Sequence, residues 1–144
     1  MPTGIAFFSL LVPDYDEALD FFLRVLNFDL REDTDLGGGK RWVRIAPKGA
    51  QTEILLARAV GDEQIAAIGA QGGGRVWLFL ETQDFDTDFA RMSELGVTFE
   101  AAPRTEPYGR VVVWQDPWGN RWDLIEFAQS DRNGTAPATA TLSE

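Results

Sequence analysis

The chain of 144 residues is long enough for one domain with a buried core, and its 44% hydrophobic and 12% aromatic content is typical of a globular protein. It contains no histidine and no cysteine. Catalytic triads, imidazole bases, thiolate nucleophiles and metal sites built from His or Cys are therefore excluded. The 23 acidic and 13 basic residues give a net charge of −10, which argues against nucleic-acid binding because such a chain repels phosphate backbones.

The apolar start of the chain, residues 1–12, has no basic segment before it and no small-residue cleavage site after it. An acidic stretch from Asp14 to Asp20 follows immediately. This arrangement does not fit a secretory signal or a membrane span. We therefore expect a cytoplasmic protein that does not bind membranes.

Hydrophobic periodicity predicts the elements of the first half in chain order. Residues 4–12 form a β-rich run, and apolar residues at helical spacing over 16–26 predict a helix. A short helix is predicted at 61–70. Between the two helices, three strands are predicted at 28–31, 40–46 and 52–57.

The same order of elements follows a run of glycines at 72–74. A strand is predicted at 75–81, and an apolar stripe over 85–95 predicts a helix. From residue 129 to residue 144 the chain is small and polar, which predicts a disordered tail. Before that tail, three more strands are predicted at 97–101, 110–115 and 121–127.

The second half repeats the first at a constant offset of 70 residues. Matching pairs include Asp14 and Asp84, Pro47 and Pro117, Gly49 and Gly119, and Glu53-Ile54-Leu55 and Asp123-Leu124-Ile125. The sequence thus predicts two β-α-β-β-β modules, at 4–58 and 74–128, with a linker at 59–73. Neither module can bury both faces of a small sheet alone, so we expect the two to associate within one chain or across a dimer.

Two segments carry a resemblance to a known family, VPDYDEALDFFLRVLNFDL near the start and YGRVVVWQDPWGNRWDLIEF near the end. With the tandem modules, residues 4–128 resemble the vicinal oxygen chelate superfamily. That group includes glyoxalase I, extradiol dioxygenases, and the fosfomycin- and bleomycin-resistance proteins. The resemblance implies a single α+β domain over residues 1–128, in which each module is a cup-shaped mixed sheet with its helix outside. It also implies a homodimer and a cavity enclosed by the cups.

Catalytic members of the superfamily bind a divalent metal through one residue of the first strand and one residue of the last strand of each module. By resemblance, these positions are Phe7 and Glu53 in module one, and Trp77 and Asp123 in module two. Both carboxylates are retained, whereas aromatic rings stand at the two usual imidazole positions. We expect no metal and no other cofactor, because the rings would exclude the waters that an all-oxygen Mg²⁺ or Mn²⁺ site needs.

Strand alternation predicts which side chains face the cavity, because successive residues of a strand point to opposite faces. In the last strand, Trp122 and Leu124 suit the helix side, so Arg121 and Asp123 face the cup. Alternation does not assign a face to Trp114, because both faces of its strand are apolar. Trp114 is expected in the cavity only because the 70-residue repeat matches it to Arg44. The expected ligand-binding set is Phe7, Trp42, Arg44, Glu53, Trp77, Phe79, Trp114, Arg121 and Asp123.

An aromatic cavity with a few charged groups is the general form of a small-molecule site. Carboxylates beside aromatic faces favour an organic cation. Two alternatives remain open: Glu53 and Asp123 form ion pairs with Arg44 and Arg121, and the aromatic rings fill the cup as core. Where the arginines dominate the cavity, the preference inverts and anions bind.

The sequence therefore predicts a metal-free protein that binds or sequesters a small molecule. The alternative is an enzyme of the superfamily, a lyase, isomerase or dioxygenase, in which Glu53 or Asp123 acts as general base with or without a divalent metal. A third hypothesis is a structural domain with a collapsed cup. The sequence does not name the ligand or substrate.

Overall fold

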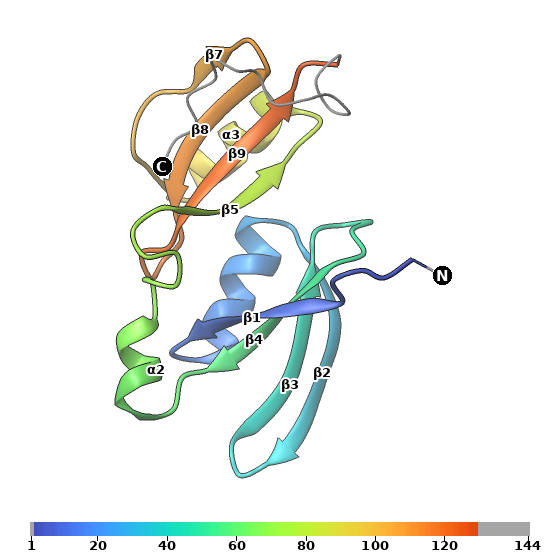
Figure 1. The fold of residues 1–144 in the computed structure, drawn as a ribbon, viewed down its shortest axis with the longest axis vertical. Coiled ribbons are helices and arrows are strands. Elements are labelled where there is room, and N and C mark those ends of the chain that lie inside the picture. Colours follow the sequence, from blue (N-terminus) through green and yellow to red (C-terminus); the bar gives the residue numbers. More distant parts are fainter. Residues whose placement is uncertain (1, 130–144) are drawn as a thin grey trace. The chain divides into compact units, whose positions relative to one another are not determined.

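The structure is a computed structural model that describes residues 2–129 (Figure 1). The predicted tail lies outside the described residues, except for Gln129. The chain divides into two compact units, unit 1 (Met1–Ile68) and unit 2 (Gly69–Glu144). The division falls within the predicted linker, which also contains a short helix, α2 (Gly61–Ala67).

Unit 1 is built on a four-stranded mixed sheet with the strand order β1-β4-β3-β2. β1 and β4 are parallel, and the other neighbouring strands are antiparallel. Together with the helix after β1, this is the β-α-β-β-β order that the sequence predicts. The strands are β1 (Phe7–Val12), β2 (Asp29–Gly37), β3 (Lys40–Ala46) and β4 (Glu53–Arg58).

The helical segment of unit 1 begins as α1 (Tyr15–Leu19) and continues as a π-helical segment, η1 (Asp20–Val25). The Asp14 carboxylate caps α1 by accepting the Glu17 N–H at 2.8 Å. The sequence predicts one regular helix here; instead, the wider π turn buries the consecutive rings of Phe21 and Phe22. One side of the sheet is buried against these helices through Leu10, Val12, Val43, Ile45, Ile54 and Leu56.

Unit 2 repeats the arrangement with the strand order β5-β9-β8-β6, and β7 also pairs with β8. The helix α3 (Phe85–Glu94) packs against β9. The strands are β5 (Val76–Glu81), β6 (Thr98–Phe99), β7 (Arg104–Glu106), β8 (Gly109–Gln115) and β9 (Arg121–Phe127). Two mixed sheets with few helices confirm the predicted α+β class.

The sequence predicts a single strand at residues 97–101, and this prediction is wrong in its bounds. The structure has two short strands, β6 and β7, on either side of Pro103. Proline has no N–H to donate to a β-ladder, so the pairing with β8 is interrupted there. The β7 strand was not predicted.

The two units pair their strands differently, although their elements follow in the same order. In unit 1, Val43 pairs with Leu56, whereas the repeat of Val43, which is Val113, pairs with Asp123 and not with Glu126. The β8–β9 pairing is therefore shifted by three residues. An odd shift exchanges the two faces of a strand, so positions on β8 do not inherit the orientation of their counterparts on β3.

Candidate functional site

In unit 1, the structure places four of the expected site residues on the sheet face opposite the helices, which we call the open face. Phe7 pairs with Glu53, and Arg44 pairs with Leu55, so these side chains share one face. The ring of Trp42 meets the ring of Phe7 edge-on at 5.7 Å between centroids. Phe7 stays 38% exposed. The open face thus offers an aromatic surface that the helices do not cover.

The Glu53 carboxylate on this face is buried between two arginines. Arg44 donates to its Oε1, and Arg31 donates to its Oε2 at 3.2 Å. Arg44 also bonds Glu32 Oε1 at 2.9 Å through Nη2. The ion-pair alternative therefore holds for Glu53. A carboxylate with two guanidinium partners has little capacity left to attract a cation or to remove a proton.

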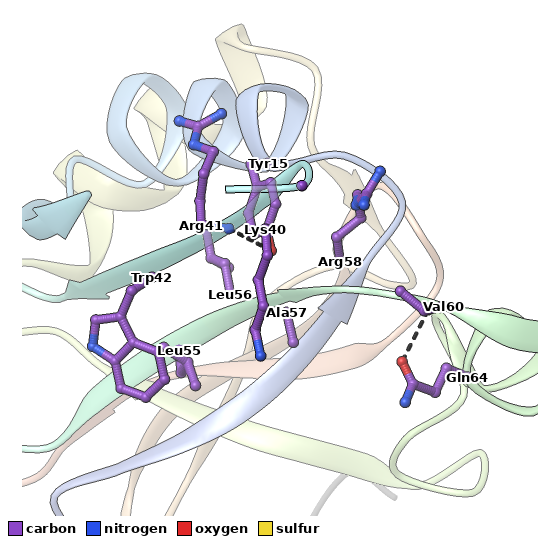
Figure 2. A pocket seen from close by; sticks show the side chains of 11 residues that line it. Tyr15, Lys40, Arg41, Trp42, Leu55, Leu56, Ala57, Arg58, Val60 and Gln64 are labelled. Atoms are coloured by element: carbon purple, nitrogen blue, oxygen red, sulfur yellow. Dashed lines mark hydrogen bonds between the residues drawn. The ribbon is translucent and has the colours of Figure 1, made fainter. Parts of the chain in front are cut away.

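The open face continues into a pocket of about 530 Å³ that lies within unit 1 (Figure 2). Its apolar wall is formed by Trp42, Leu55 and Ala57. The basic residues Lys40, Arg41 and Arg58 also line it, and no acidic residue is among its lining residues. The pocket is therefore aromatic and basic.

The pocket is shaped by the tight β2–β3 hairpin. Gly38 and Gly39 form its two-residue turn with φ of +64° and +83°, a left-handed pair that matches the twist of a hairpin and that other residues rarely adopt. A Cβ atom on Gly39 would lie 3.3 Å from Nη2 of Arg58, so the guanidinium packs against the hairpin tip. At the other end, the Val60 N–H donates to Gln64 Oε1 at 2.9 Å.

The three basic residues of the pocket differ in their partners. Arg41 bonds the carboxylates of Asp33 at 2.7 Å and Asp16 at 2.9 Å, and these hydrogen bonds raise the pKa of Arg41. The side chains of Lys40 and Arg58 are exposed and make no ion pair or hydrogen bond within residues 2–129. Two cations of the pocket are thus available to a ligand.

In unit 2, Asp123 is fully buried, and neither of its carboxylate oxygens has a hydrogen-bond partner in the described part of the chain. Burial raises the pKa of Asp123 to about 6, and the positive charges of Arg104 and Arg121 offset part of that effect. An ion pair between Arg121 and Asp123 was one alternative, and it is wrong. Arg121 instead bonds Glu100 at 2.8 Å through both Nε and Nη2.

The side of the unit 2 sheet that carries Asp123 is packed. Tyr108, Val111 and Ile125 form a buried cluster there, with Phe127 against it. Val111 pairs with Ile125, and Val113 pairs with Asp123, so β8 contributes valines to this face. The part of this face formed by β8 and β9 is therefore covered, whereas Phe79 on β5 stays 49% exposed.

The remaining expected site residues also lie in unit 2, and the expectation for Trp114 is wrong. Trp114 pairs with Trp122 on the helix side, where the two indoles stack at 4.7 Å; the three-residue shift of β8 is the cause. Phe79 pairs with Asp123 in the position that the repeat assigns to Trp77. Trp77 lies at a bulge of β5 and packs closely on Gly72: a Cβ atom added to Gly72 would lie 2.6 Å from the Cβ atom of Trp77.

The Asp-Pro-Trp-Gly-Asn segment that carries the resemblance is a structural turn between β8 and β9. The buried Asp116 carboxylate accepts the backbone N–H groups of Trp118, Gly119 and Asn120 at 3.0–3.1 Å. It also accepts from Asn120 Nδ2 at 2.9 Å and from the indole Nε1 of Trp122 at 3.0 Å. Burial still raises the pKa of Asp116. This carboxylate holds the turn and has no free oxygen for chemistry.

The residues at the metal positions of the resemblance do not fit a divalent metal. Glu53 is bound by two arginines. Phe7 and Trp77, at the two imidazole positions, and Phe79, which pairs with Asp123 in place of Trp77, have no atom that can coordinate a metal. Among residues 2–129, no group of three or more acidic side chains gathers into a metal-binding cluster.

The same part of the chain contains no helix that is long and apolar enough to cross a membrane.

Two mixed sheets, each with its helix on one side, follow the β-α-β-β-β order of the vicinal oxygen chelate proteins, with the additional short strand β7 in unit 2. The family model for the Glyoxalase/Bleomycin resistance protein/Dioxygenase superfamily matches residues 4–124. The chain belongs to this superfamily, and the resemblance seen in the sequence is confirmed.

Relatives of known structure are similar over almost their whole length. TnmS3, an antibiotic binding protein from Streptomyces sp. CB03234, is 33% identical with a TM-score of 0.73, over 88% of this chain and 98% of that one. A glyoxalase/bleomycin resistance protein from the same organism is 35% identical with a TM-score of 0.66, over 85% and 99%. An uncharacterised protein of Shewanella frigidimarina is 47% identical over 88% of this chain and 96% of its own.

Proposed function

We propose that the protein binds a small organic molecule on the open face and in the adjoining pocket of unit 1, and that it does so without a metal. One observation carries the proposal: a pocket of about 530 Å³ opens beside Trp42 on a sheet face that the helices leave uncovered. Pockets for drug-sized ligands have volumes of about 300–1,000 Å³. The similarity to TnmS3, an antibiotic binding protein, supports sequestration of an antibiotic-like compound.

The ligand would contact the pocket mainly through an aromatic or apolar body. The Trp42 ring is half-buried and is held from one side by the edge of Phe7, so it is a pre-ordered stacking surface. Leu55 and Ala57 extend the apolar wall along β4. Glu53 contributes little to ligand charge selection, because its charge is already met by Arg31 and Arg44.

Replacing Trp42 by alanine is expected to weaken binding of a neutral aromatic probe by about tenfold, because truncation of a central aromatic contact costs more than 1 kcal/mol. The measurement is a fluorescence titration with N-phenyl-1-naphthylamine, carried out with and without EDTA. Trp118→Ala is the matched control, since Trp118 does not line the pocket. Equal affinity in the Trp42 variant would contradict the proposed site, and loss of binding in EDTA would contradict metal-free binding.

An enzyme of the superfamily is the second candidate, and one observation favours it. A carboxylic acid with a pKa of about 6, as burial gives Asp123, is suited to general acid–base catalysis near neutral pH. The same burial leaves both oxygens of Asp123 without solvent contact. Since a substrate must reach the catalytic group, the accessible pocket of unit 1 supports binding better than this carboxyl supports catalysis.

We also propose that the protein acts as a homodimer in the cytoplasm. Several large apolar side chains outside the pocket are exposed, including Ile5 at 71% and Leu36 at 52%, and such side chains, where they gather into one patch, are typical of interfaces between subunits. Sedimentation equilibrium at micromolar concentration is expected to give twice the mass of one chain. A single-chain mass that persists as the protein is concentrated would contradict the dimer.

A further inference from the structure

We propose that the pocket of unit 1 selects organic anions, molecules that combine an aromatic body with a carboxylate or sulfonate group. This inference rests on the proposed function and names the ligand class of the same site. Its starting observation is the lining of the pocket, which includes three basic residues and no acidic one. The pocket therefore carries a local excess of positive charge, whereas the chain as a whole has a net charge of −10.

The pairing of charges in unit 1 separates the pocket from the rest of the surface. Each basic side chain of this unit that lies outside the pocket has an acidic partner. These pairs are Arg24 with Asp20, Arg31 with Glu53, Arg44 with Glu32 and Lys48 with Asp29. Lys40 and Arg58, which line the pocket, have no such partner within residues 2–129. The unpaired positive charge of unit 1 is therefore concentrated at the pocket.

Lys40 is the better placed of the two to meet the charged group of a ligand. It lies two residues before Trp42 on β3, so both side chains leave the same face of the sheet. Two residues of a strand span about 7 Å, a distance that a bicyclic ring with an acidic substituent covers. Arg58 packs on the hairpin tip, and in Figure 2 it extends to a different side of the pocket from Lys40.

The charge of Arg41 adds to the same field only weakly, because Asp16 and Asp33 already neutralise it. We therefore assign the anion contact to Lys40 and a longer-range contribution to Arg58. A charge-assisted hydrogen bond from an ammonium group is short and strong compared with a neutral one. The preference for cations that the carboxylates suggest does not apply here, since Glu53 is paired and Asp123 does not line this pocket.

The test compares two probes with the same aromatic body: 1-anilinonaphthalene-8-sulfonate, which is anionic, and N-phenyl-1-naphthylamine, which is neutral. Lys40→Gln is expected to weaken binding of the sulfonate by about tenfold and Arg58→Gln by about threefold. Both variants should bind the neutral probe within about twofold of the wild type. Added NaCl should weaken binding of the sulfonate alone.

Lys48→Gln is the control, because it removes one positive charge of unit 1 that lies outside the pocket and is paired with Asp29; it should bind both probes as the wild type does. Lys40→Arg should restore most of the affinity for the sulfonate. Equal changes for the two probes would overturn the anion inference and leave the proposed function standing, whereas an Arg58 effect larger than that of Lys40 would overturn the assignment of the anion contact to Lys40. If neither probe depends on Trp42, the proposed function fails and this inference fails with it.

Discussion

Replacing Asp123 by asparagine is expected to stabilise the protein more at pH 8 than at pH 4. The change that the substitution makes to the free energy of unfolding should be more favourable at pH 8 by about 2–3 kcal/mol. The reason is the burial of a carboxylate without hydrogen bonds, which raises the pKa of Asp123 from 3.8 to about 6. Because the folded protein holds this proton more tightly than the unfolded chain, the associated stability is complete below pH 4. It is lost as the pH rises through 6. Asparagine is uncharged throughout and avoids that loss.

The measurement is urea unfolding of the wild type and the variant at intervals from pH 4 to pH 8, with the difference between the two curves as the readout. No other group that acts on Asp123 titrates in this range: Arg104 and Arg121 remain charged, and burial raises the pKa of Tyr108 further above it. Glu100→Gln is a control of opposite sign, because Arg121 lowers the pKa of Glu100. Parallel curves for the wild type and Asp123→Asn between pH 4 and pH 8 would show that Asp123 is not destabilised by burial.

The order of the elements was predictable because local patterns determine it. Two strands, Lys40–Ala46 and Arg121–Phe127, have the predicted bounds, because each is rich in strand-forming residues and directly follows a glycine-containing turn. The prediction failed where one residue overrides the pattern, as Pro103 does between β6 and β7. The π-helical turn of η1 was also not predictable, because apolar spacing over residues 16–26 fits an α-helix equally well.

The faces of the strands were predictable in unit 1 and for β9 of unit 2, but not for β8 and for the bulged start of β5. Alternation placed Trp42 and Glu53 on one face because β3 and β4 pair without a bulge. In unit 2, the connection between β8 and β9 is the Asp116-anchored turn, and β5 carries a bulge. Turns and bulges of this kind set the register of strand pairing. The register of unit 2 therefore cannot be inferred from that of unit 1 through the sequence repeat. This is why Trp114 faces the helix side and why Phe79 replaces Trp77 beside Asp123.

The charge of the site could be predicted only in part. The alternation that assigns Trp42 to the open face also assigns Lys40 to it, so that signal was present in the sequence. The partners of the charges were not, because Arg31 reaches Glu53 across 22 residues of sequence. Whether Lys40 or Arg58 has a partner is likewise decided by tertiary structure. A site whose ligand preference depends on unpaired charge therefore needs the folded structure before its sign can be stated.

Replacing Asp116 by alanine is expected to lower the free energy of unfolding by about 3–5 kcal/mol. The substitution removes one buried carboxylate that accepts from five donor groups, namely three backbone N–H groups, the Asn120 amide and the Trp122 indole. The Gly119 N–H keeps a second acceptor, the backbone carbonyl of Asp116, at 3.1 Å. The effect should spread beyond the turn, because Asn120 Oδ1 accepts the Gln71 N–H at 3.3 Å. Urea unfolding followed by circular dichroism measures the loss.

Asp86→Ala is the matched control for this prediction, since it removes a carboxylate of the same unit whose side chain is 82% exposed and pairs with Arg110. Exposed ion pairs contribute about 0–1 kcal/mol, so the control should lose far less stability than Asp116→Ala. A binding measurement distinguishes a role of Asp116 in stability from a role in ligand binding. Under conditions in which the Asp116→Ala variant is still folded, the variant should bind N-phenyl-1-naphthylamine with the affinity of the wild type. A stable Asp116 variant, with a loss no larger than that of Asp86→Ala, would show that the Asp-Pro-Trp-Gly-Asn segment does not stabilise the β8–β9 turn and that its carboxylate must be explained by another role.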